Sequence, residues 1–514
     1  CGDRPGFVVN RFFVPWLNEA CLLLEEGHGT AAQIDAVARK AFRIGLGPFG
    51  LMNLTGPPIA LHSTDYLAEQ LITPRYCGAA NLRELVGENR MWEIDEEESY
   101  TENQYEEISR RLYGVVFGVA TQIVAEGVCS IEDVDRGAKV GLRWARGPFE
   151  LMNRVGVKNS YEMAKDYLAL CQDDEGNSNW ILPDFFADQA SKNMAWDFSY
   201  VDTQISDGIA TITINRPEAM NALNETVIQQ LGLAVAAIND NDAVHTMVLD
   251  GAGKAFIAGA DVKFFVDKIR SDSIEDIVEF TSNGHKVLNA IENSTKTTIA
   301  LTTGLALGGG LELALCCDYR IGTRRTQFRF PETSIGIYPG LGGSQRPARI
   351  SGIPLARWAV LGGNFMSAQV AYDIGLLTHL VDLADVDGVA QACSRDGKPV
   401  EKYPGKPNFE ESTVVKFATD FYSDANLPTL LSGGCPDGYD SADKTISRQL
   451  KNLKYTAPIA LSMASELIDI TATTTLAEGL DSELSKLTDI FSTRDALEGL
   501  SALIEGRRAT YTNS

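Results

Sequence analysis

Apolar residues recur at steps of three and four along two stretches of the first two hundred residues, Phe12–Glu26 and Leu112–Glu126. This spacing places the apolar side chains on one face of a helix, and a glycine follows each run. The same kind of pattern returns over Ala31–Phe42 and Ile131–Leu142. We therefore expect an all-helical N-terminal region.

The helical stretches belong to an internal repeat. Residues 11–56 align with residues 111–156 at an offset of 100 without a gap, and about 14 of the 46 positions are identical. Both copies contain the segment G-P-F-x-L-M-N. A match of this length indicates a duplicated domain, because a solenoid would repeat at a much shorter period. We expect two helical domains, residues 1–95 and 96–198.

From Val201 onward, short β-rich runs alternate with helical ones. Ile209–Ile214, Thr246–Leu249 and Thr298–Leu301 are expected to be strands, and Glu225–Ile238 a helix between the first two. This alternation is typical of an α/β domain. We expect this domain to comprise a core at residues 199–387, a polar insertion at 388–450 and C-terminal helices at 451–514.

Charge and cysteine usage exclude several classes of function. The net charge is −24 and the isoelectric point is near 4.7, whereas nucleic-acid binding depends on Lys and Arg. The nine cysteines show no C-x-x-C spacing, which argues against a disulfide framework or a metal site and favours a reducing cytoplasm. Glycines, threonines and Glu312 interrupt the longest apolar stretch, so we expect no membrane span.

Two glycine-rich segments each carry a glutamate. In GLALGGGLELA (304–314), three glycines precede Glu312 at the start of a helix, where exposed N–H groups attract negative charge. In FRFPETSIGIYPGLGG (328–343), Glu332 lies beside an apolar run. Two such carboxylates can share one water molecule as acid and base. The alternatives are a purely structural glycine turn and a helix-dipole role for Glu312.

A third segment, KAFIAGADVK (254–263), has small residues after an expected strand, so its backbone N–H groups are accessible to a ligand. Lys254 and Lys263 flank it. These lysines either contact an anionic group or are ordinary solvated side chains.

Five segments together resemble the crotonase superfamily, and within it the enoyl-CoA hydratases. They are GIATITINRPEAMNALN (208–224), KAFIAGADVK, GLALGGGLELA, FPETSIGIYPGLGG (330–343) and DALEGLSALIEGRRATY (495–511). They occur in the order found in that family, with its spacing between the two glutamates. The resemblance implies the crotonase ββα spiral and the addition of water to a 2-enoyl-CoA thioester.

By this resemblance, Glu312 and Glu332 match the two catalytic glutamates of the hydratases. The glutamate at the Glu332 position gives a proton to the α-carbon, and the one at the Glu312 position holds and activates water. The N–H groups of Ala260 and Gly309 match the oxyanion hole, and Gly340 matches a glycine that lines the water site.

The resemblance also implies contacts to coenzyme A. Ala258 matches a backbone contact to the adenine, and Lys254 and Lys263 match positions near the phosphates. Acyl-CoA esters are the expected ligands, a homo-oligomer is the expected assembly, and no cofactor is expected for hydration. Superfamily isomerases and hydrolases commonly lack one of the two glutamates. An isomerase or hydrolase remains one alternative, and a non-catalytic acyl-CoA-binding module is another.

The N-terminal half resembles a second family. DRPGFVVNRFFVPWLNEA (3–20) is similar to the opening of the C-terminal helical domain of 3-hydroxyacyl-CoA dehydrogenases, and Asn10 falls on that family's active-site asparagine. Without the resemblance, Asn10 would be a helix cap or turn residue. The Rossmann domain that carries NAD is missing; the G-x-G-x-x-G match at 45–50 contains Pro48 and follows a helix. We expect the C-terminal piece of a bifunctional enzyme, with NAD bound only by the missing domain.

Overall fold

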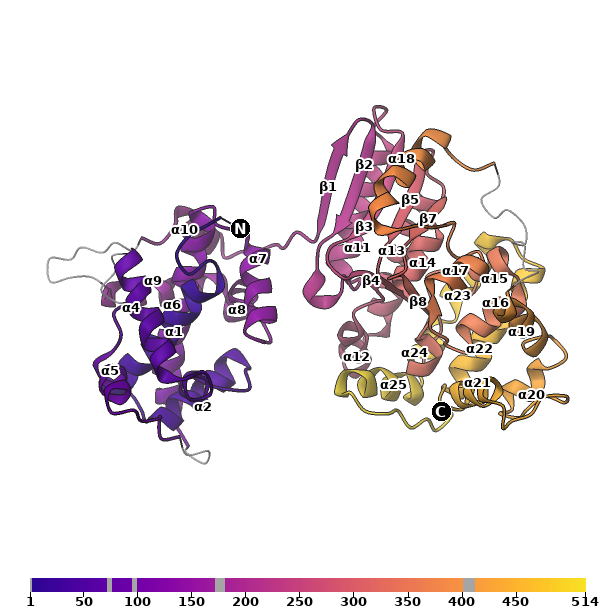
Figure 1. The fold of residues 1–514 in the computed structure, drawn as a ribbon. Coiled ribbons are helices and arrows are strands. Elements are labelled where there is room, and N and C mark those ends of the chain that lie inside the picture. Colours follow the sequence, from indigo (N-terminus) through magenta and orange to yellow (C-terminus); the bar gives the residue numbers. More distant parts are fainter. Residues whose placement is uncertain (1, 72–75, 95–98, 172–180, 401–411) are drawn as a thin grey trace. The chain divides into compact units, whose positions relative to one another are not determined.

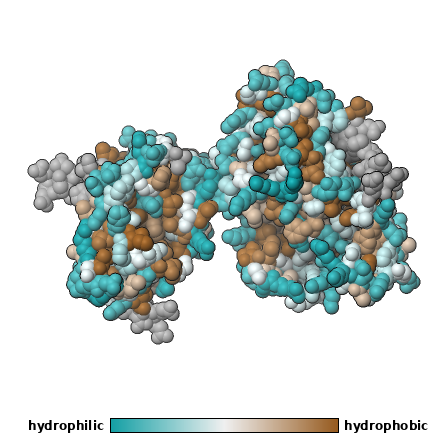
Figure 2. Space-filling view, viewed as in Figure 1, coloured by the Kyte–Doolittle hydropathy of each residue, from teal (hydrophilic) through white to brown (hydrophobic). Residues whose placement is uncertain are grey.

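The computed structural model describes residues 2–71, 76–94, 99–171, 181–400 and 412–514. They form two compact units, Cys1–Ser199 (unit 1) and Tyr200–Ser514 (unit 2), shown in Figure 1. On the face of each unit drawn in Figure 2, hydrophilic residues are interspersed with smaller hydrophobic areas. Within the described ranges, none of the helices combines the length and the apolar character needed to cross a membrane.

The regular elements among the described residues of unit 1 are all helices, as the periodicity predicted. Its helices are α1 (Val9–Glu25), α2 (Ala31–Phe42), α3 (Pro48–Thr55), α4 (Pro57–Leu71), α5 (Ala80–Gly87), α6 (Glu102–Ala125), α7 (Ile131–Arg136), α8 (Pro148–Val155), α9 (Val157–Leu170) and α10 (Asp184–Lys192). Helix α6 begins ten residues earlier than expected because Thr101 and Gln104 form a capping box. The helix expected at 131–142 is α7 followed by a π-helical turn, Gly137–Gly141.

The repeated G-P-F segment begins a helix that is capped by a distant aspartate. The carboxylate of Asp35 accepts hydrogen bonds from the N–H groups of Phe49 and Gly50, both at 2.8 Å. One hundred residues on, Asp135 accepts the same two bonds, also at 2.8 Å, at the start of α8. Burial raises the pKa of Asp135 to about 8. A Cβ on Gly47 would lie 2.4 Å from the Asp35 carboxyl carbon, so the glycine of this motif makes room for the cap.

Two ion pairs relate the halves of unit 1 reciprocally. Arg11 pairs with Glu126, with Nη1 2.5 Å from Oε2, and Arg111 pairs with Glu26. Arg11 and Arg111 occupy equivalent positions of the two copies, and so do Glu26 and Glu126, so each arginine binds the glutamate of the other copy. Buried side chains of both copies, such as Trp16 and Trp144, also belong to one core, with ring centroids 5.5 Å apart. The two expected segments, 1–95 and 96–198, thus pack against each other within one compact unit.

Unit 2 contains two sheets. The larger has the strand order β1-β2-β3-β5-β7-β10 and is parallel except for the β1–β2 hairpin; the smaller has the order β4-β6-β8-β9 and is parallel except for β8–β9. The strands are β1 (Val201–Ser206), β2 (Ile209–Ile214), β3 (Thr246–Gly251), β4 (Ala255–Ala258), β5 (Thr297–Thr302), β6 (Leu305–Leu307), β7 (Tyr319–Gly322), β8 (Gln327–Arg329), β9 (Met366–Ser367) and β10 (His379–Leu380).

Successive strands of unit 2 alternate between the sheets. The pairs β3–β4, β5–β6 and β7–β8 each place one strand in the larger sheet and the next in the smaller, and helices follow the first two pairs. This is the ββα spiral of the expected α/β class. The helices of this core are α11 (Glu225–Asn239), α12 (Val262–Arg270), α13 (Ile274–Glu292), α14 (Gly309–Leu315), α15 (Arg346–Ser351), α16 (Ile353–Val360) and α17 (Ala368–Asp373).

The described part of the stretch expected as an insertion, 388–450, is packed structure. It contributes most of α18 (Val386–Asp396), which covers the larger sheet at β5 and β7, and all of α19 (Thr413–Phe421) and α20 (Leu427–Leu431). Its last residues begin α21 (Lys444–Lys454). The chain ends in helices, as expected: α22 (Pro458–Asp469), α23 (Leu476–Ser485), α24 (Leu487–Phe491) and α25 (Arg494–Glu505).

The second half of unit 1 offers a test of the repeated contacts. The amide of Asn153 bonds both the C=O and the N–H of buried Trp196, at 2.9 and 2.7 Å, as Asn53 does for Trp92. Replacing Asn153 by Ala leaves both groups unpaired and should lower the free energy of unfolding by about 1–3 kcal/mol.

Denaturant unfolding followed by tryptophan fluorescence measures this change, because five of the six tryptophans lie before residue 200. Asn103→Ala is the matched control, since Asn103 makes an exposed contact with Glu107 at 3.0 Å. Its effect should stay within about 0.5 kcal/mol. Equal effects of the two variants would contradict the prediction.

Candidate functional site

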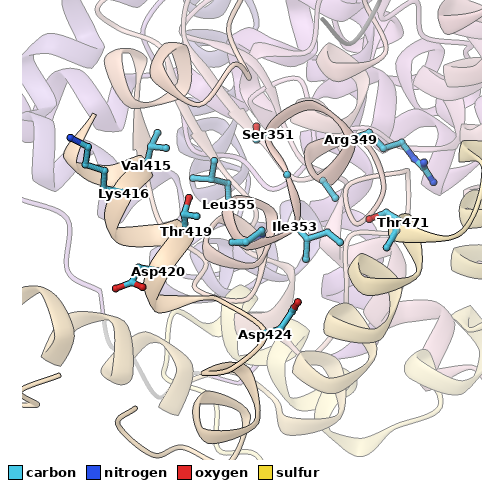
Figure 3. A pocket seen from close by; sticks show the side chains of 14 residues that line it. Arg349, Ser351, Ile353, Leu355, Val415, Lys416, Thr419, Asp420, Asp424 and Thr471 are labelled. Atoms are coloured by element: carbon cyan, nitrogen blue, oxygen red, sulfur yellow. The ribbon is translucent and has the colours of Figure 1, made fainter. Parts of the chain in front are cut away.

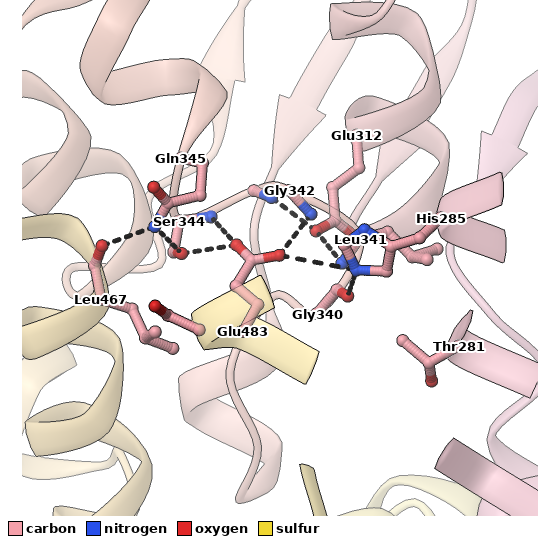
Figure 4. Close-up of polar contacts among 12 residues, drawn as sticks. Thr281, His285, Glu312, Gly340, Leu341, Gly342, Ser344, Gln345, Leu467 and Glu483 are labelled. Carbon is pink, nitrogen blue, oxygen red and sulfur yellow. Dashed lines mark hydrogen bonds and ion pairs between the residues drawn. The ribbon is translucent and has the colours of Figure 1, made fainter. Parts of the chain in front are cut away.

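Glu312 lies in the first turn of α14 and is almost completely buried, at 2% exposure. Its Oε1 atom accepts hydrogen bonds from the N–H groups of Leu341 and Gly343, each at 2.7 Å. Both bonds end on Oε1, and the Oε2 atom lies 3.8 Å from the position that a Cβ would take on Gly309. The loop after Gly340 therefore fixes the carboxyl group (Figure 4). The distance at Gly309 places its second oxygen near the start of α14.

Glu332 begins a short 3₁₀ turn, Glu332–Ile335, after β8, and is 7% exposed. Its Oε1 atom lies 2.1 Å from where a Cβ on Gly308 would be, so the glutamate occupies the space that a side chain at Gly308 would take. Its Oε2 atom is buried and accepts no hydrogen bond from the described residues. The two glutamates thus both reach the backbone of the turn at residues 308–309.

The surroundings of the two carboxyl groups separate their acidities. Burial raises the pKa of Glu312 to about 7, opposed by the N–H groups of Leu341 and Gly343 and by the Arg346 charge. The pKa of Glu332 is raised well above its ordinary value, first by burial and then by the negative charge of Glu312. Near neutral pH, the arrangement favours a protonated Glu332 beside an ionised Glu312.

Ala260 and Gly309 follow two paired parallel strands. In the β4–β6 ladder Ala258 pairs with Leu307, and the two residues lie two positions farther along their strands. Asp261 N–H bonds the Leu223 carbonyl, so the preceding N–H of Ala260 faces the opposite side. Gly309 is the first residue of α14, where an N–H has no partner within the helix. Among the described residues, neither N–H donates a backbone hydrogen bond.

Gly340 lies next to the loop that holds Glu312. Its carbonyl accepts a hydrogen bond from Nε2 of buried His285 at 2.7 Å, and burial lowers the pKa of His285 to about 4. A Cβ on Gly340 would contact Leu487 at 3.4 Å. The structure therefore places Gly340 beside the Glu312 loop, in contact with side chains from α13 and α24.

The residues matched to coenzyme A contacts lie along β4 and its flanks. Ala258 ends the strand and is half-buried, whereas Lys254 precedes the strand and Lys263 lies in the first turn of α12. Both lysines are exposed, and neither forms a salt bridge within the described ranges. Strand β4 lies between the two lysines along the chain.

Asn10 belongs to unit 1 and therefore to a different part of the chain. It lies in α1 and lines a pocket of about 540 Å³ together with Arg4, His62 and Tyr66. Another pocket, of about 910 Å³, is in unit 2 and is lined by residues of α15, α16 and α19, such as Arg349, Leu355 and Lys416 (Figure 3). Neither glutamate lines it.

Sequence reasoning missed the polar groups behind the Glu312 loop. Glu483, in α23, is fully buried and accepts the N–H of Gly342 at 2.7 Å, and fully buried Arg346 donates to the Leu341 carbonyl at 2.9 Å. The signal for Glu483 was present: it follows Leu480 by three residues and precedes Leu487 by four, on the apolar stripe of the C-terminal helices. An acid on such a stripe indicates a buried partner.

Gly308 provides a test of this packing. Its backbone has φ +43° and ψ −121°, and an added Cβ would overlap Glu332. Gly308→Ala should lower the stability of unit 2 by at least about 1–3 kcal/mol, since strained backbone and a displaced buried carboxylate both cost free energy. Gly388→Ala, in α18, is the control: nothing lies within 4 Å, and alanine should be neutral or stabilising there. Calorimetric unfolding compares them; equal melting temperatures would contradict the prediction.

Both parts of the chain are similar to known proteins. Residues 209–511 match the enoyl-CoA hydratase/isomerase family, and residues 6–102 and 108–193 each match the C-terminal domain of 3-hydroxyacyl-CoA dehydrogenase. Over 174 residues the chain is 41% identical to a crotonyl-CoA hydratase of Syntrophomonas wolfei, covering 34% of this chain and 65% of that protein. Over 323 residues it is 31% identical to a probable enoyl-CoA hydratase of Rhizobium meliloti, covering 62% of this chain and 99% of that protein.

Among solved structures, an enoyl-CoA hydratase from Rhodobacter sphaeroides superposes with a TM-score of 0.52 at 23% identity, covering 60% of this chain and 90% of that one. This likeness shows the fold of unit 2. The family match covers more than half of the chain. The chain therefore belongs to the enoyl-CoA hydratase/isomerase family, and in it the crotonase domain follows two copies of the 3-hydroxyacyl-CoA dehydrogenase C-terminal domain.

Proposed function

We propose that unit 2 hydrates 2-enoyl-CoA thioesters to 3-hydroxyacyl-CoA. The observation that carries the proposal is the pair of buried carboxyl groups, Glu312 and Glu332, which meet at the turn that also presents the Gly309 N–H. Family membership and the relatives named as hydratases support it.

The N–H groups of Ala260 and Gly309 would bind the thioester oxygen. Attack of water on the β-carbon of a conjugated thioester moves negative charge onto that oxygen. Two fixed amide donors stabilise the resulting enolate, and removing one donor from comparable sites slows reactions roughly a hundred- to a thousand-fold. Because these donors lie at adjacent strand ends, their spacing is set by the β4–β6 ladder.

The two glutamates would divide the proton transfers. Ionised Glu312 takes one proton from water as the oxygen bonds to the β-carbon, and protonated Glu332 gives its proton to the α-carbon. The sum is one water added. Burial and then the negative charge of Glu312 raise the pKa of Glu332 well above its ordinary value, which supports this assignment over the reverse.

The rival activities predict different products. An isomerase would shift the double bond, a hydrolase would release free CoA, and a binding module would produce no turnover. Two carboxyl groups at one turn favour hydration, because water addition needs both an acceptor and a donor of protons.

Several broader expectations remain proposals. Lys254, Lys263 and Ala258 would contact coenzyme A, and Gly340 would line the water site. Hydration would need no cofactor, while Asn10 would contact substrate only with an NAD-binding domain present. A homo-oligomer and a cytoplasmic location are proposed from the family resemblance and from cysteine usage.

Crotonyl-CoA should lose its conjugated-thioester absorbance when mixed with the full chain, and 3-hydroxybutyryl-CoA should accumulate. Glu312→Gln and Glu332→Gln should each lower kcat roughly a hundred- to ten-thousand-fold, because each removes one proton-transfer group. Glu466→Gln is the control, since Glu466 is exposed and pairs with Lys486 at 3.2 Å. Full turnover in either active-site variant would refute the assignment.

The rate of hydration should follow a bell-shaped pH profile. Below about pH 7 the buried Glu312 holds a proton and cannot accept one from water, so kcat/KM should rise as pH increases through about 7. At higher pH, Glu332 loses the proton it must donate, and the rate should fall. Initial rates from pH 5 to 10 measure both limbs. A profile flat across the acidic limb would count against Glu312 as the base.

A further inference from the structure

Four successive backbone N–H groups, of residues 341 to 344, are shared between two buried carboxylates on opposite sides of the loop. Leu341 and Gly343 donate to Glu312, each at 2.7 Å. Gly342 and Ser344 donate to Glu483, at 2.7 and 3.1 Å. Figure 4 shows the loop between the two acids, one from α14 and the other from α23.

Residues 341 to 345 form a turn, and within it successive N–H groups are directed alternately to Glu312 and to Glu483. The two sets of hydrogen bonds are therefore mechanically linked: a rotation that releases Gly342 from Glu483 also turns the N–H groups on either side away from Glu312. Gly342 has φ +100°, and a Cβ there would lie 1.7 Å from Nη1 of Arg346, so the loop has little freedom to adopt another path.

Glu483 is fully satisfied in this position. Besides the two N–H groups, its Oε1 accepts the Ser344 hydroxyl at 2.5 Å, and its own backbone carbonyl accepts the Tyr338 hydroxyl at 2.6 Å. Gln345 Nε2 in turn donates to the Ser344 hydroxyl oxygen at 2.9 Å. A buried carboxylate with three donors is held in one orientation, and removing it leaves several groups without partners.

The two acids also influence each other electrically through the loop. Burial and then the Glu312 charge raise the pKa of Glu483 to about 8, while Ser344, Arg346 and Gly342 oppose the rise. His285 lies 3.8 Å from Oε2, and burial keeps its pKa low. Arg346, whose charge opposes the rise in the Glu483 pKa, donates to Glu292 at 2.6 Å and to the Leu341 carbonyl.

We infer that Glu483 is a positioning residue for the hydration step: by binding the N–H groups of Gly342 and Ser344, it presents those of Leu341 and Gly343 to Glu312 and so aims the Glu312 carboxylate. The inference rests on the proposed function. Glu483 touches no reacting atom; it acts only through Glu312. Misplacing a catalytic group by about 1 Å can cost about a hundredfold in rate, so the effect should appear in kcat.

Glu483→Gln keeps the shape of the side chain and weakens the acceptor. Steady-state hydration of crotonyl-CoA should show kcat lowered by roughly ten- to a hundredfold, with KM changed by less than about threefold, because the substrate does not contact Glu483. Asp318→Asn is the control for removing a buried carboxylate: Asp318 accepts the N–H and hydroxyl of Thr298, both at 2.9 Å, and lies directly before strand β7 in the larger sheet. It should keep kcat within about twofold.

A double-mutant cycle with Glu312→Gln separates positioning from general damage. If Glu483 acts through Glu312, the Glu312→Gln/Glu483→Gln variant should turn over at the rate of Glu312→Gln within about twofold. Multiplied losses would overturn the inference. If Glu483→Gln does not fold, Ser344→Ala decides, because it removes the hydroxyl bond to Glu483 and an acceptor of Gln345 but keeps the four backbone N–H groups. A reduced kcat at unchanged KM supports the inference, and wild-type kcat overturns it.

The failures are distinguishable. Absence of hydration by the unaltered chain would defeat the proposed function itself. Hydration by the unaltered chain, with Glu483→Gln folded and retaining wild-type kcat, would defeat only the role assigned to Glu483.

Discussion

The site in unit 2 depends on the burial of two acidic side chains next to one glycine turn. Placing a carboxylate in the protein interior is unfavourable unless donors surround it or a proton neutralises it. Glu312 is stabilised by the first means, through two backbone N–H groups, and Glu332 by the second. The glycines at 308 and 343 leave the volume that these side chains occupy, since a Cβ at either position would meet a glutamate oxygen. The proposed roles of base and acid follow from this difference in environment between two glutamates.

The sequence predicted the α/β class, the strands over residues 209–214 and 298–301, and the helical N-terminal half. These features depend on the spacing of apolar residues and on glycines at element ends, which are local properties of the sequence. The pairing of Ala258 with Leu307, which brings Ala260 beside Gly309, is a matter of sheet register. Register depends on contacts between distant segments, so only the family resemblance suggested it. The packing of the two helical repeats against each other could not be predicted for the same reason: the ion pairs that join them connect residues more than eighty positions apart.

Glu483 illustrates a second limit of sequence reasoning. Its position on an apolar stripe indicates burial, but the partner is a set of backbone N–H groups in a loop about 140 residues earlier. Every residue except proline has a backbone N–H, so the residue types in the sequence do not show which of these groups bind Glu483. Catalytic side chains can be recognised by their chemistry, whereas the groups that orient them are recognised only once the chain is folded.

The duplication in unit 1 has let its two copies diverge. Asn10 and Tyr66 line a pocket in the first copy. At the equivalent positions of the second copy, Arg110 and Asp166 form an ion pair, with Nε 2.9 Å from Oδ2. Both copies share the aspartate caps at Asp35 and Asp135 and the hydrogen bonds from Asn53 and Asn153 to a tryptophan. The first copy nevertheless has a pocket where the second has an ion pair. Doubling a scaffold within one polypeptide lets equivalent positions of the two copies take different side chains while the shared framework is kept.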